Sequence, residues 1–185
     1  MTDIERKARF ERVALPQLDA AFNLARWLTG NDRDAEDVVQ EAYLRAFRYF
    51  DGYRGGDGRS WMLSIVRRTA FTWLERNRRP GTVPFEEFDA SEMPAADGGS
   101  APPDDPEQSA IRSADRRRLG ELIAALPAQF RDVLVLRELE DMPYRDIATV
   151  CGIPIGTVMS RLARARAMLR QAWIRPQRKG LSHGL

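Results

Sequence analysis

The chain has 185 residues, with 29 Lys and Arg against 27 Asp and Glu, and its formal net charge is +2 at neutral pH. This length suits one large domain or two small ones, and a hydrophobic fraction of 43% is enough to build a core. No apolar run reaches the roughly 20 residues that a membrane-spanning helix needs. The first residues mix acids and bases and lack the apolar segment of a signal peptide. We therefore expect a cytoplasmic protein without membrane insertion.

Several kinds of chemistry are excluded by the scarcity of cysteine and histidine. The chain has one cysteine, Cys151, and one histidine, His183, which lies in a Gly- and Ser-flanked tail. A structural zinc site needs about four such ligands, and a Ser-His-Asp triad needs a positioned imidazole. No phosphate-binding loop of the GxxxxGK or GxGxxG type occurs. We expect no catalytic residues, no metal and no cofactor, and a protein whose function is binding.

The first helices are predicted by apolar residues at helical spacing. One helix covers about residues 15–30 and ends at Gly30, and a second runs from the capping residues Asn31 and Asp32 to about Phe50. Polar residues occupy one side of this second helix, and two carboxylates and an amide stand close together there: Asp37, Gln40 and Glu41. This spacing suits a partner helix rich in arginine, although a merely solvated face has the same pattern.

A Gly-rich loop at 51–58 precedes a third predicted helix, at about 60–77, which combines cations with aromatic rings. Aromatic side chains can stack on unpaired bases, each stack contributing roughly 1–3 kcal/mol. From helical geometry we expect Trp61 and Ile65 to lie mostly in the core, with Arg67 and Arg68 exposed. Trp73 adds a second indole ring to the same helix.

Residues 80–110 have the composition of a linker. They contain eight acids, six prolines and no Lys or Arg, so the rest of the chain carries a net charge of +10. Such a segment buries too little apolar surface to fold alone. On its far side, residues 155–185 contain seven bases and no acid. Clustered arginine is typical of nucleic-acid binding, although a solvated face can also carry such charge.

After the linker, helices are predicted at about 107–125, 128–140, 144–150 and 156–173, the last two joined by a tight turn at Cys151-Gly152. This is the pattern of a helix-turn-helix, in which the second helix enters the major groove of DNA. An ordinary helical hairpin with a basic face is the alternative. No segment resembles a strand, so we expect an all-α protein of two small helical domains joined by a flexible acidic linker. The second helix would project Thr157, Ser160, Arg161 and Arg164 toward phosphates and base edges.

A family resemblance covers most of the chain outside the linker and the termini. Residues 125–170, with ALP, IA followed by G, and GTVMSRLARAR, resemble region 4 of sigma-70 factors of the extracytoplasmic-function (ECF) group. Residues 34–47 resemble region 2.2, and residues 60–79 resemble regions 2.3 and 2.4. The resemblance implies region 2 at 1–79, a linker at 80–110, region 4 at 111–175 and a basic tail at 176–185.

The resemblance also implies partners: core RNA polymerase, through its β′ clamp and β subunits, promoter DNA, and an anti-sigma factor. Asp37, Gln40 and Glu41 would bind core polymerase. The minus-10 DNA would be bound by Trp61, Arg67, Arg68 and Trp73, and the minus-35 DNA by Thr157, Met159, Ser160, Arg161, Ala163 and Arg164. The family commonly has Asn at the position of Arg68 and a basic residue at that of Met159, and both departures bear on promoter specificity.

Two other functions remain as alternatives: a stand-alone helix-turn-helix regulator, for which the region 2 motifs would be superfluous, and a carboxylate enzyme, for which no pocket signature is present. The linker acids also have two interpretations. In the family this linker passes through the polymerase cleft toward the RNA exit path, so the acids would mimic the charge of RNA. Alternatively, they only keep the linker soluble and away from the protein's own DNA.

Overall fold

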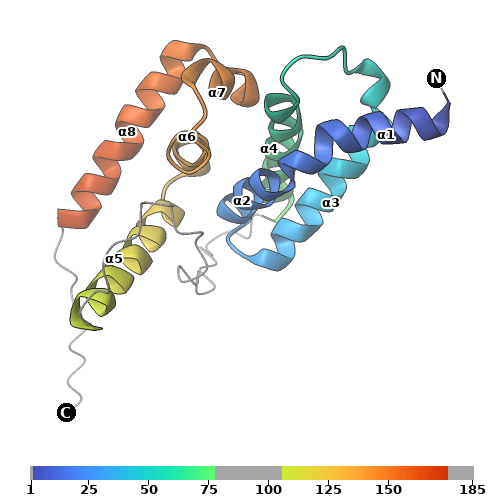
Figure 1. The fold of residues 1–185 in the computed structure, drawn as a ribbon. Coiled ribbons are helices and arrows are strands. Elements are labelled where there is room, and N and C mark those ends of the chain that lie inside the picture. The colour runs from blue at the N-terminus through green and yellow to red at the C-terminus, as the bar shows by residue number, and fades with distance from the viewer. Residues whose placement is uncertain (1, 78–105, 175–185) are drawn as a thin grey trace.

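The protein consists of two groups of helices (Figure 1). The structure, a computed structural model, describes residues 2–77, which we call the N-terminal half, and residues 106–174, which we call the C-terminal half. Neither range contains a strand, so the all-α prediction is confirmed for the residues described. The N-terminal half contains α1 (Asp3–Ala14), η1 (Leu15–Gln17), α2 (Leu18–Thr29), α3 (Asp32–Arg48), η2 (Phe50–Gly52) and α4 (Gly58–Arg76). The C-terminal half contains α5 (Pro106–Ala124), α6 (Ala128–Glu138), α7 (Tyr144–Cys151) and α8 (Ile155–Ile174).

The acidic segment and the basic tail fall mostly outside the described residues. Helix α5 begins at Pro106, inside the range 80–110 that composition predicts as a linker. Proline is favoured in the first turn of a helix because its missing N–H is not needed there. The rest of the linker and the tail at 176–185 are not described, and neither is the role of their charges.

Helix α1 was not expected from the apolar pattern. A capping box begins it: the Thr2 side chain accepts from the backbone N–H of Glu5, and the Glu5 carboxylate accepts from the N–H of Thr2 at 2.7 Å. Only Phe10 and Ala14 of this helix are buried, which explains why periodicity missed it. The Thr-x-x-Glu motif was the available signal.

The helix predicted over 15–30 begins later than expected, because residues Leu15–Gln17 form a 3-10 turn that contains Pro16. Pro16 has no backbone N–H, so it cannot donate to the carbonyl four residues earlier, and the regular α-helical hydrogen bonding of α1 ends there. Helix α2 then runs to Gly30, which has φ 89° and ends the helix in the left-handed conformation that glycine adopts without strain.

Helices α2, α3 and α4 pack against one another around a core that includes Leu24, Leu28, Phe50 and Met62. Asn31 caps α3 as predicted, since its side chain accepts from the N–H of Asp34 at 2.9 Å. The apolar side of α3 packs into this core, and the opposite side of the helix faces solvent.

The helix-turn-helix is formed by α7 and α8. Gly152 lies between them with φ 65° and ψ 37°, again in the left-handed region. Ile147, Val158 and Leu162 are fully buried between the two helices, as expected from the sequence. Helix α6 packs across both helices, and α5 packs on α8.

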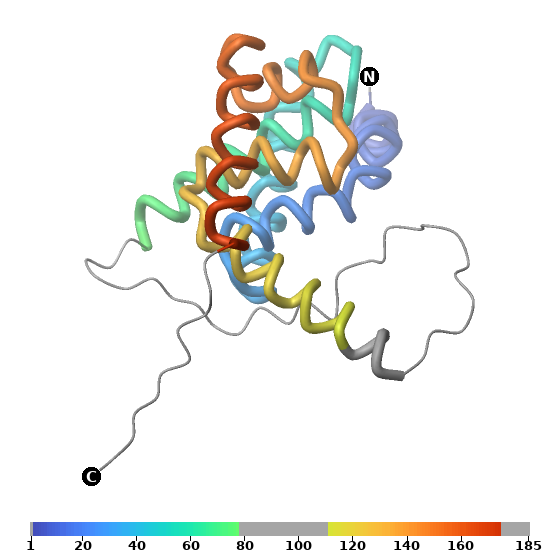
Figure 2. Tube along the Cα trace, turned by 90° about the vertical axis from the view of Figure 1, so that its left-hand side faces the viewer, coloured from blue at the N-terminus to red at the C-terminus, as the bar shows by residue number. Residues whose placement is uncertain are grey.

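The two halves lie against each other in the structure. Helix α4 packs on α7, and α2 packs on α6 (Figure 1). The perpendicular view also shows the two halves in contact, with the C-terminal half in front of the N-terminal half (Figure 2). These two helix pairs form what we call the interhalf interface.

We expect Gly152→Ala to lower the free energy of unfolding by about 1–2 kcal/mol, because an L residue in the left-handed region is strained. The matched control is Gly156→Ala. A Cβ at either glycine meets no atom within 4 Å, but Gly156 lies in α8 with a negative φ. Urea unfolding followed by circular dichroism should show the loss for Gly152→Ala only. Equal stabilities of the two variants would contradict the strain argument.

Candidate nucleic-acid interface

The second helix of the helix-turn-helix presents the predicted polar face to solvent. Ser160 and Arg164 are exposed, and Thr157 and Arg161 are partly exposed. Their spacing of three, four and seven residues places them along one side of α8. The guanidinium of Arg164 lies 5.8 Å from the centre of the Phe130 ring, which leaves its N–H groups available as donors. These four side chains form what we call the recognition face.

Beside the recognition face, α8 carries an apolar strip. Met159 is 53% exposed, and Ala163 is exposed one helical turn further on. Arg166 is held elsewhere, because its Nε donates to the Glu138 carboxylate at 3.1 Å. The Glu138 pair therefore restrains Arg166, whereas Met159 and Ala163 are exposed beside the recognition face.

Helix α4 only partly matches its predicted exposure. Trp61 and Ile65 pack against the core and are partly buried, and Arg68 is exposed, as expected. Trp73 is partly exposed near the end of the helix. The prediction that Arg67 is exposed is wrong: its side chain is 17% exposed, and its Nε donates to Asp132 of the C-terminal half at 2.7 Å.

The polar side of α3 is exposed as the sequence predicted, with Asp37, Gln40 and Glu41 all facing solvent. The Glu41 carboxylate accepts from Arg45 at 2.9 Å, four residues along the helix. Sequence reasoning missed Leu44, whose side chain is 59% exposed. Leu44 follows Glu41 by three residues and Gln40 by four, and this helical spacing could have shown that it shares their exposed side. We call these four residues, Asp37, Gln40, Glu41 and Leu44, the α3 face.

The interhalf interface contains a fully buried carboxylate. Asp132 accepts from the Arg67 Nε and from the backbone N–H of Val133, both at 2.7 Å, and its exposure is zero. The thiol of Cys151 lies 3.8 Å from the same carboxylate. Burying an unpaired charge would be very costly, so Asp132 depends on Arg67 for its charge to be tolerated there.

A second carboxylate, Glu140, is 8% exposed and joins the same two halves. It accepts from Arg59 of α4 at 2.8 Å and from the amide of Asn23 of α2 at 3.1 Å. A third polar contact runs from Arg131, which donates to the carbonyl of Trp27 near the C-terminal end of α2 at 2.8 Å. Burial lowers the pKa of Arg131, and the neighbouring Asp132 carboxylate acts against that shift.

Neither buried carboxylate of the interface, Asp132 or Glu140, was singled out from the sequence. Asp132 directly precedes the apolar run 133–136, which is completely buried, and Glu140 follows the end of that run by four residues. An acid beside such a run is a signal of a buried carboxylate. Its partners Arg67 and Arg59 are 65 and 81 residues away, and no local pattern identifies them.

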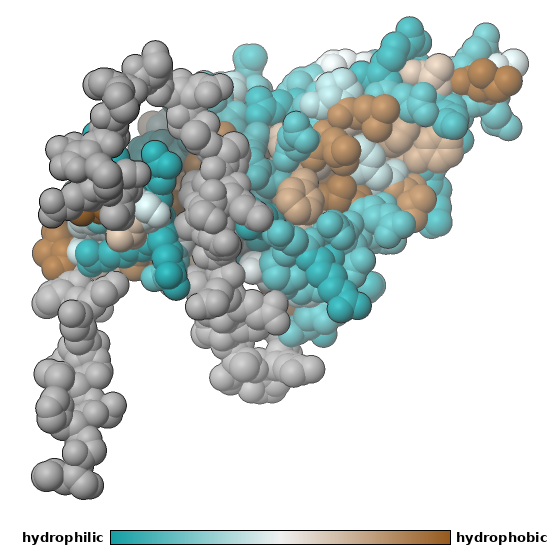
Figure 3. Space-filling view, turned by 60° about the horizontal axis from the view of Figure 1, so that its bottom comes forward, coloured by the Kyte–Doolittle hydropathy of each residue, from teal (hydrophilic) through white to brown (hydrophobic). Residues whose placement is uncertain are grey.

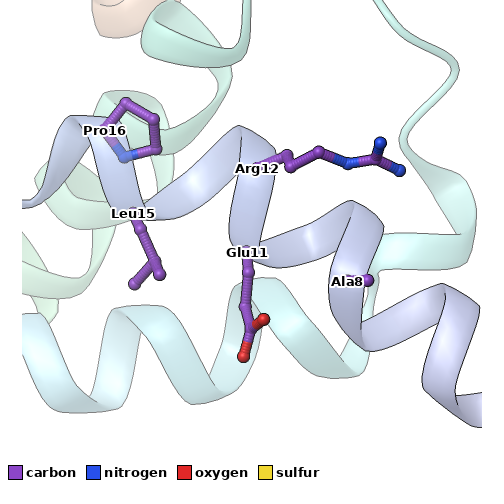
Figure 4. Close-up of a pocket in the computed structure, with 5 residues that line it drawn as sticks. All are labelled: Ala8, Glu11, Arg12, Leu15 and Pro16. Carbon is purple, nitrogen blue, oxygen red and sulfur yellow. The ribbon is translucent and has the colours of Figure 1, made fainter.

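Outside these surfaces the described residues offer little for chemistry. Ala8, Glu11, Arg12, Leu15 and Pro16 line a shallow, open depression beside α1 (Figure 4). Apolar surface gathers on the same half of the molecule (Figure 3), where Ile4, Leu15 and Leu18 are exposed. Over 2–77 and 106–174, no cluster of His, Cys, Asp or Glu could hold a metal ion. In the same ranges, no helix is long and apolar enough to cross a membrane.

Comparison with known proteins places both halves in one family. Residues 17–80 match the family model of Sigma-70 region 2, and residues 116–169 match that of Sigma-70 region 4. The ECF RNA polymerase sigma factor SigE of Mycolicibacterium smegmatis is 34% identical over 82% of this chain, which spans only 56% of that protein. The RNA polymerase sigma-H factor of Pseudomonas aeruginosa is 33% identical over 90% of this chain and 86% of its own. The ECF RNA polymerase sigma-E factor of Haemophilus influenzae is 34% identical, over 89% and 87%.

Solved structures share the fold. The sigma factor RpoE of Bartonella quintana, in complex with the anti-sigma factor NepR, has a TM-score of 0.64 at 22% identity, over 89% of this chain and 96% of that one. The sigma factor fold and the helix-turn-helix define a class of bacterial transcription initiation factors. This chain belongs to the sigma-70 family and, within it, to the ECF group.

We expect the single thiol, Cys151, to react slowly in the folded protein. Burial first, and then the Asp132 carboxylate, raise its pKa to about 12. At pH 8 roughly one thiol in ten thousand is then ionised, against roughly one in four in an unfolded chain, and only the thiolate is nucleophilic. Labelling with a chromogenic disulfide at pH 8 should be at least about a hundredfold slower than in guanidinium. Equal rates with and without guanidinium would show that the thiol is accessible.

Proposed function

We propose that this chain binds core RNA polymerase, directs it to specific promoters and assists promoter opening. It acts in the cytoplasm and catalyses no reaction itself. The observation that carries this proposal is that surfaces of opposite charge lie on different helices: the basic recognition face on α8 and the acidic α3 face. A stand-alone repressor needs the first surface and has no use for the second.

The α3 face is the proposed contact with core polymerase. Its two carboxylates suit a partner helix rich in arginine, since carboxylates form strong, charge-assisted hydrogen bonds with guanidinium groups. Leu44 adds an exposed apolar side chain at the centre of the same surface. An apolar centre with a polar rim is the usual arrangement of a protein interface.

The DNA contacts are divided between the two halves. On α8, the recognition face and the neighbouring Met159 and Ala163 would meet the minus-35 element in the major groove. On α4, Arg67, Arg68, Trp61 and Trp73 would hold the unpaired strand of the minus-10 element. Trp61 is packed in the core, so its contribution to DNA binding would be limited to the edge that remains exposed.

An anti-sigma factor is a further proposed partner. Two of the similar solved structures are complexes with such proteins: RpoE with NepR, and CnrH with the cytosolic domain of CnrY, the second with a TM-score of 0.59. An inhibitor that binds the free factor would have to cover the α3 face or the DNA surfaces to prevent transcription.

Reversing the charge of Asp37 and Glu41 to Lys should abolish co-purification with core polymerase, because the α3 face would then repel an arginine-rich partner. The variant loses the Glu41–Arg45 pair, but such a helical pair contributes only about 0.3–0.5 kcal/mol, so the fold should persist. Circular dichroism checks this.

The matched control reverses Asp3, which is exposed, and Glu11, which is partly exposed, and it gives the same change in net charge. Both lie on α1, a different helix from the one that carries the α3 face. Retained core binding by the Asp37 and Glu41 variant would contradict the proposed contact.

Replacing Arg164 by Ala should relax base preference at one position of the minus-35 element by about 1–3 kcal/mol, since a bidentate Arg reads guanine. Arg161→Ala should instead weaken all promoters about equally and lower the salt dependence, as expected for a phosphate contact. Footprinting by the holoenzyme on a library of upstream sequences measures both effects. Arg170→Ala on the same helix is the control. Unchanged footprints for both variants would exclude α8 as the recognition helix.

A further inference from the structure

Helix α1 holds the C-terminal end of α3 through Arg6. The Arg6 guanidinium donates to the Phe47 carbonyl at 2.8 Å, and its Nε donates to the Asp51 carboxylate at 2.9 Å. The same guanidinium lies 4.6 Å from the centre of the Phe47 ring. The last carbonyls of a helix have no partner within that helix, so Arg6 supplies a donor that α3 itself lacks. With only 21% of its side chain exposed, Arg6 is held in place by these three contacts.

A row of aromatic rings leads from α1 to Trp61, near the start of α4. The ring of Phe10 in α1 lies edge-on to the ring of Phe50, with their centres 5.3 Å apart, and Phe50 is fully buried. Phe50 stacks on Tyr53 at 5.7 Å, and Tyr53 lies 4.7 Å from Trp61. Phe50 also lies 5.9 Å from Trp61. Contacts between aromatic rings depend on their relative orientation, so each ring in the row restrains the next.

The contacts of Arg6 enclose the segment that carries this row. Phe47 and Asp51, which both accept from Arg6, lie before and after Phe50 in the chain. Helix α1 therefore restrains Phe50 twice, through the backbone on either side of it and through the ring contact. Because Trp61 packs on Phe50, its orientation depends on both restraints.

The end of α1 also meets the first turn of α4 directly. A Cβ added to Gly58, the first residue of α4, would lie 2.8 Å from the Val13 Cγ1, which is closer than such carbons approach in proteins. A residue without a Cβ is what allows the two helices to come this close. Helix α1 thus reaches α4 at the turn that precedes Trp61.

These contacts come from a helix outside the family match, since the residues that match Sigma-70 region 2 begin at 17 and α1 ends at Ala14. Only Phe10 and Ala14 of α1 are buried, so the helix adds little apolar surface to the core. Its best-defined contacts instead converge on Phe50 and, through it, on a side chain that the proposed function assigns to the minus-10 strand.

We propose that Arg6 is a positioning residue for promoter opening. Through the end of α3 and the Phe50 ring, it fixes the exposed edge of Trp61 against which an unpaired base would stack. A binding side chain is only as precise as the residues that support it, and stacking requires two flat faces to overlap. Arg6 itself does not touch the DNA. This inference rests on the proposed function, because it concerns how the same minus-10 surface is held.

The first test compares Arg6→Ala with Lys7→Ala in the full chain. Lys7 pairs with Glu11 of its own helix at 3.9 Å, so both variants lose one positive charge but only Arg6→Ala loses the link to α3. Hydrogen exchange of residues 49–61 in the free protein should be at least about threefold faster in Arg6→Ala, because local opening of this segment becomes easier. Lys7→Ala should match the wild type. Unchanged exchange in a folded Arg6→Ala would show that α1 does not hold this segment.

The second test measures promoter opening by the holoenzyme, through permanganate oxidation of unpaired thymines on a promoter that the wild-type factor opens. Arg6→Ala should lower the equilibrium constant for opening about fivefold, which is the smaller loss expected when one base stack is weakened. Lys7→Ala should leave it unchanged. Co-purification with core polymerase and protection of the minus-35 DNA should match the wild type in both variants, because neither proposed surface includes α1.

A double-mutant cycle with Trp61→Leu shows whether Arg6 acts through that ring. In the Trp61→Leu background, Arg6→Ala should change opening by less than about twofold, because the ring that it positions is gone. If Arg6→Ala has lost helical circular dichroism, Phe10→Leu takes its place, since it keeps an apolar side chain but removes the ring contact with Phe50. Unchanged opening by a folded variant, or equal losses with and without Trp61, would overturn the proposal.

Failure here is distinguishable from failure of the proposed function. A wild-type factor that does not co-purify with core polymerase contradicts the proposed function itself. A factor that binds core polymerase and opens promoters equally well with Arg6→Ala retains that function, and only the positioning role of Arg6 is lost.

Discussion

The burial of Asp132 is the constraint on which the arrangement of the two halves depends. A carboxylate with no exposure must be paired, and its charged partner is supplied by α4 of the other half, through Arg67. Replacing such a pair by apolar side chains is often neutral or stabilising, whereas removing one member is strongly destabilising. The pair therefore adds little to the stability of the fold. It does determine which surface of the N-terminal half can lie against α6 and α7, because another orientation would leave the charge unpaired.

Local features of the fold could be predicted because their causes lie close together in the sequence. The cap at Asn31, the polar side of α3 and the turn at Gly152 each depend on residues within about two helical turns. The exposure of Arg68 and of the recognition face follows from the same periodicity. Helix α1 was missed because only two of its residues are buried, although its capping box was visible in the sequence.

The contacts between the halves could not be predicted, and Arg67 shows why. Helical geometry places its side chain away from the core of its own half, so exposure was the reasonable expectation. The residue that covers it lies 65 positions along the chain, and pairing over such a separation leaves no periodic trace. The family itself is confirmed by relatives that share about a third of their residues with this chain.

Because the two halves belong to one chain, even a weak interface between them can be formed much of the time. Asn77 and Pro106 are joined through 28 residues, so each half experiences the other at an effective concentration set by that chain length, roughly in the millimolar range for flexible connections. An interface with a millimolar dissociation constant would be negligible between separate molecules at cellular concentrations, yet it is substantially occupied within one chain. The number of residues between the halves thus affects how often the interhalf contact forms, without any substitution in the contact itself.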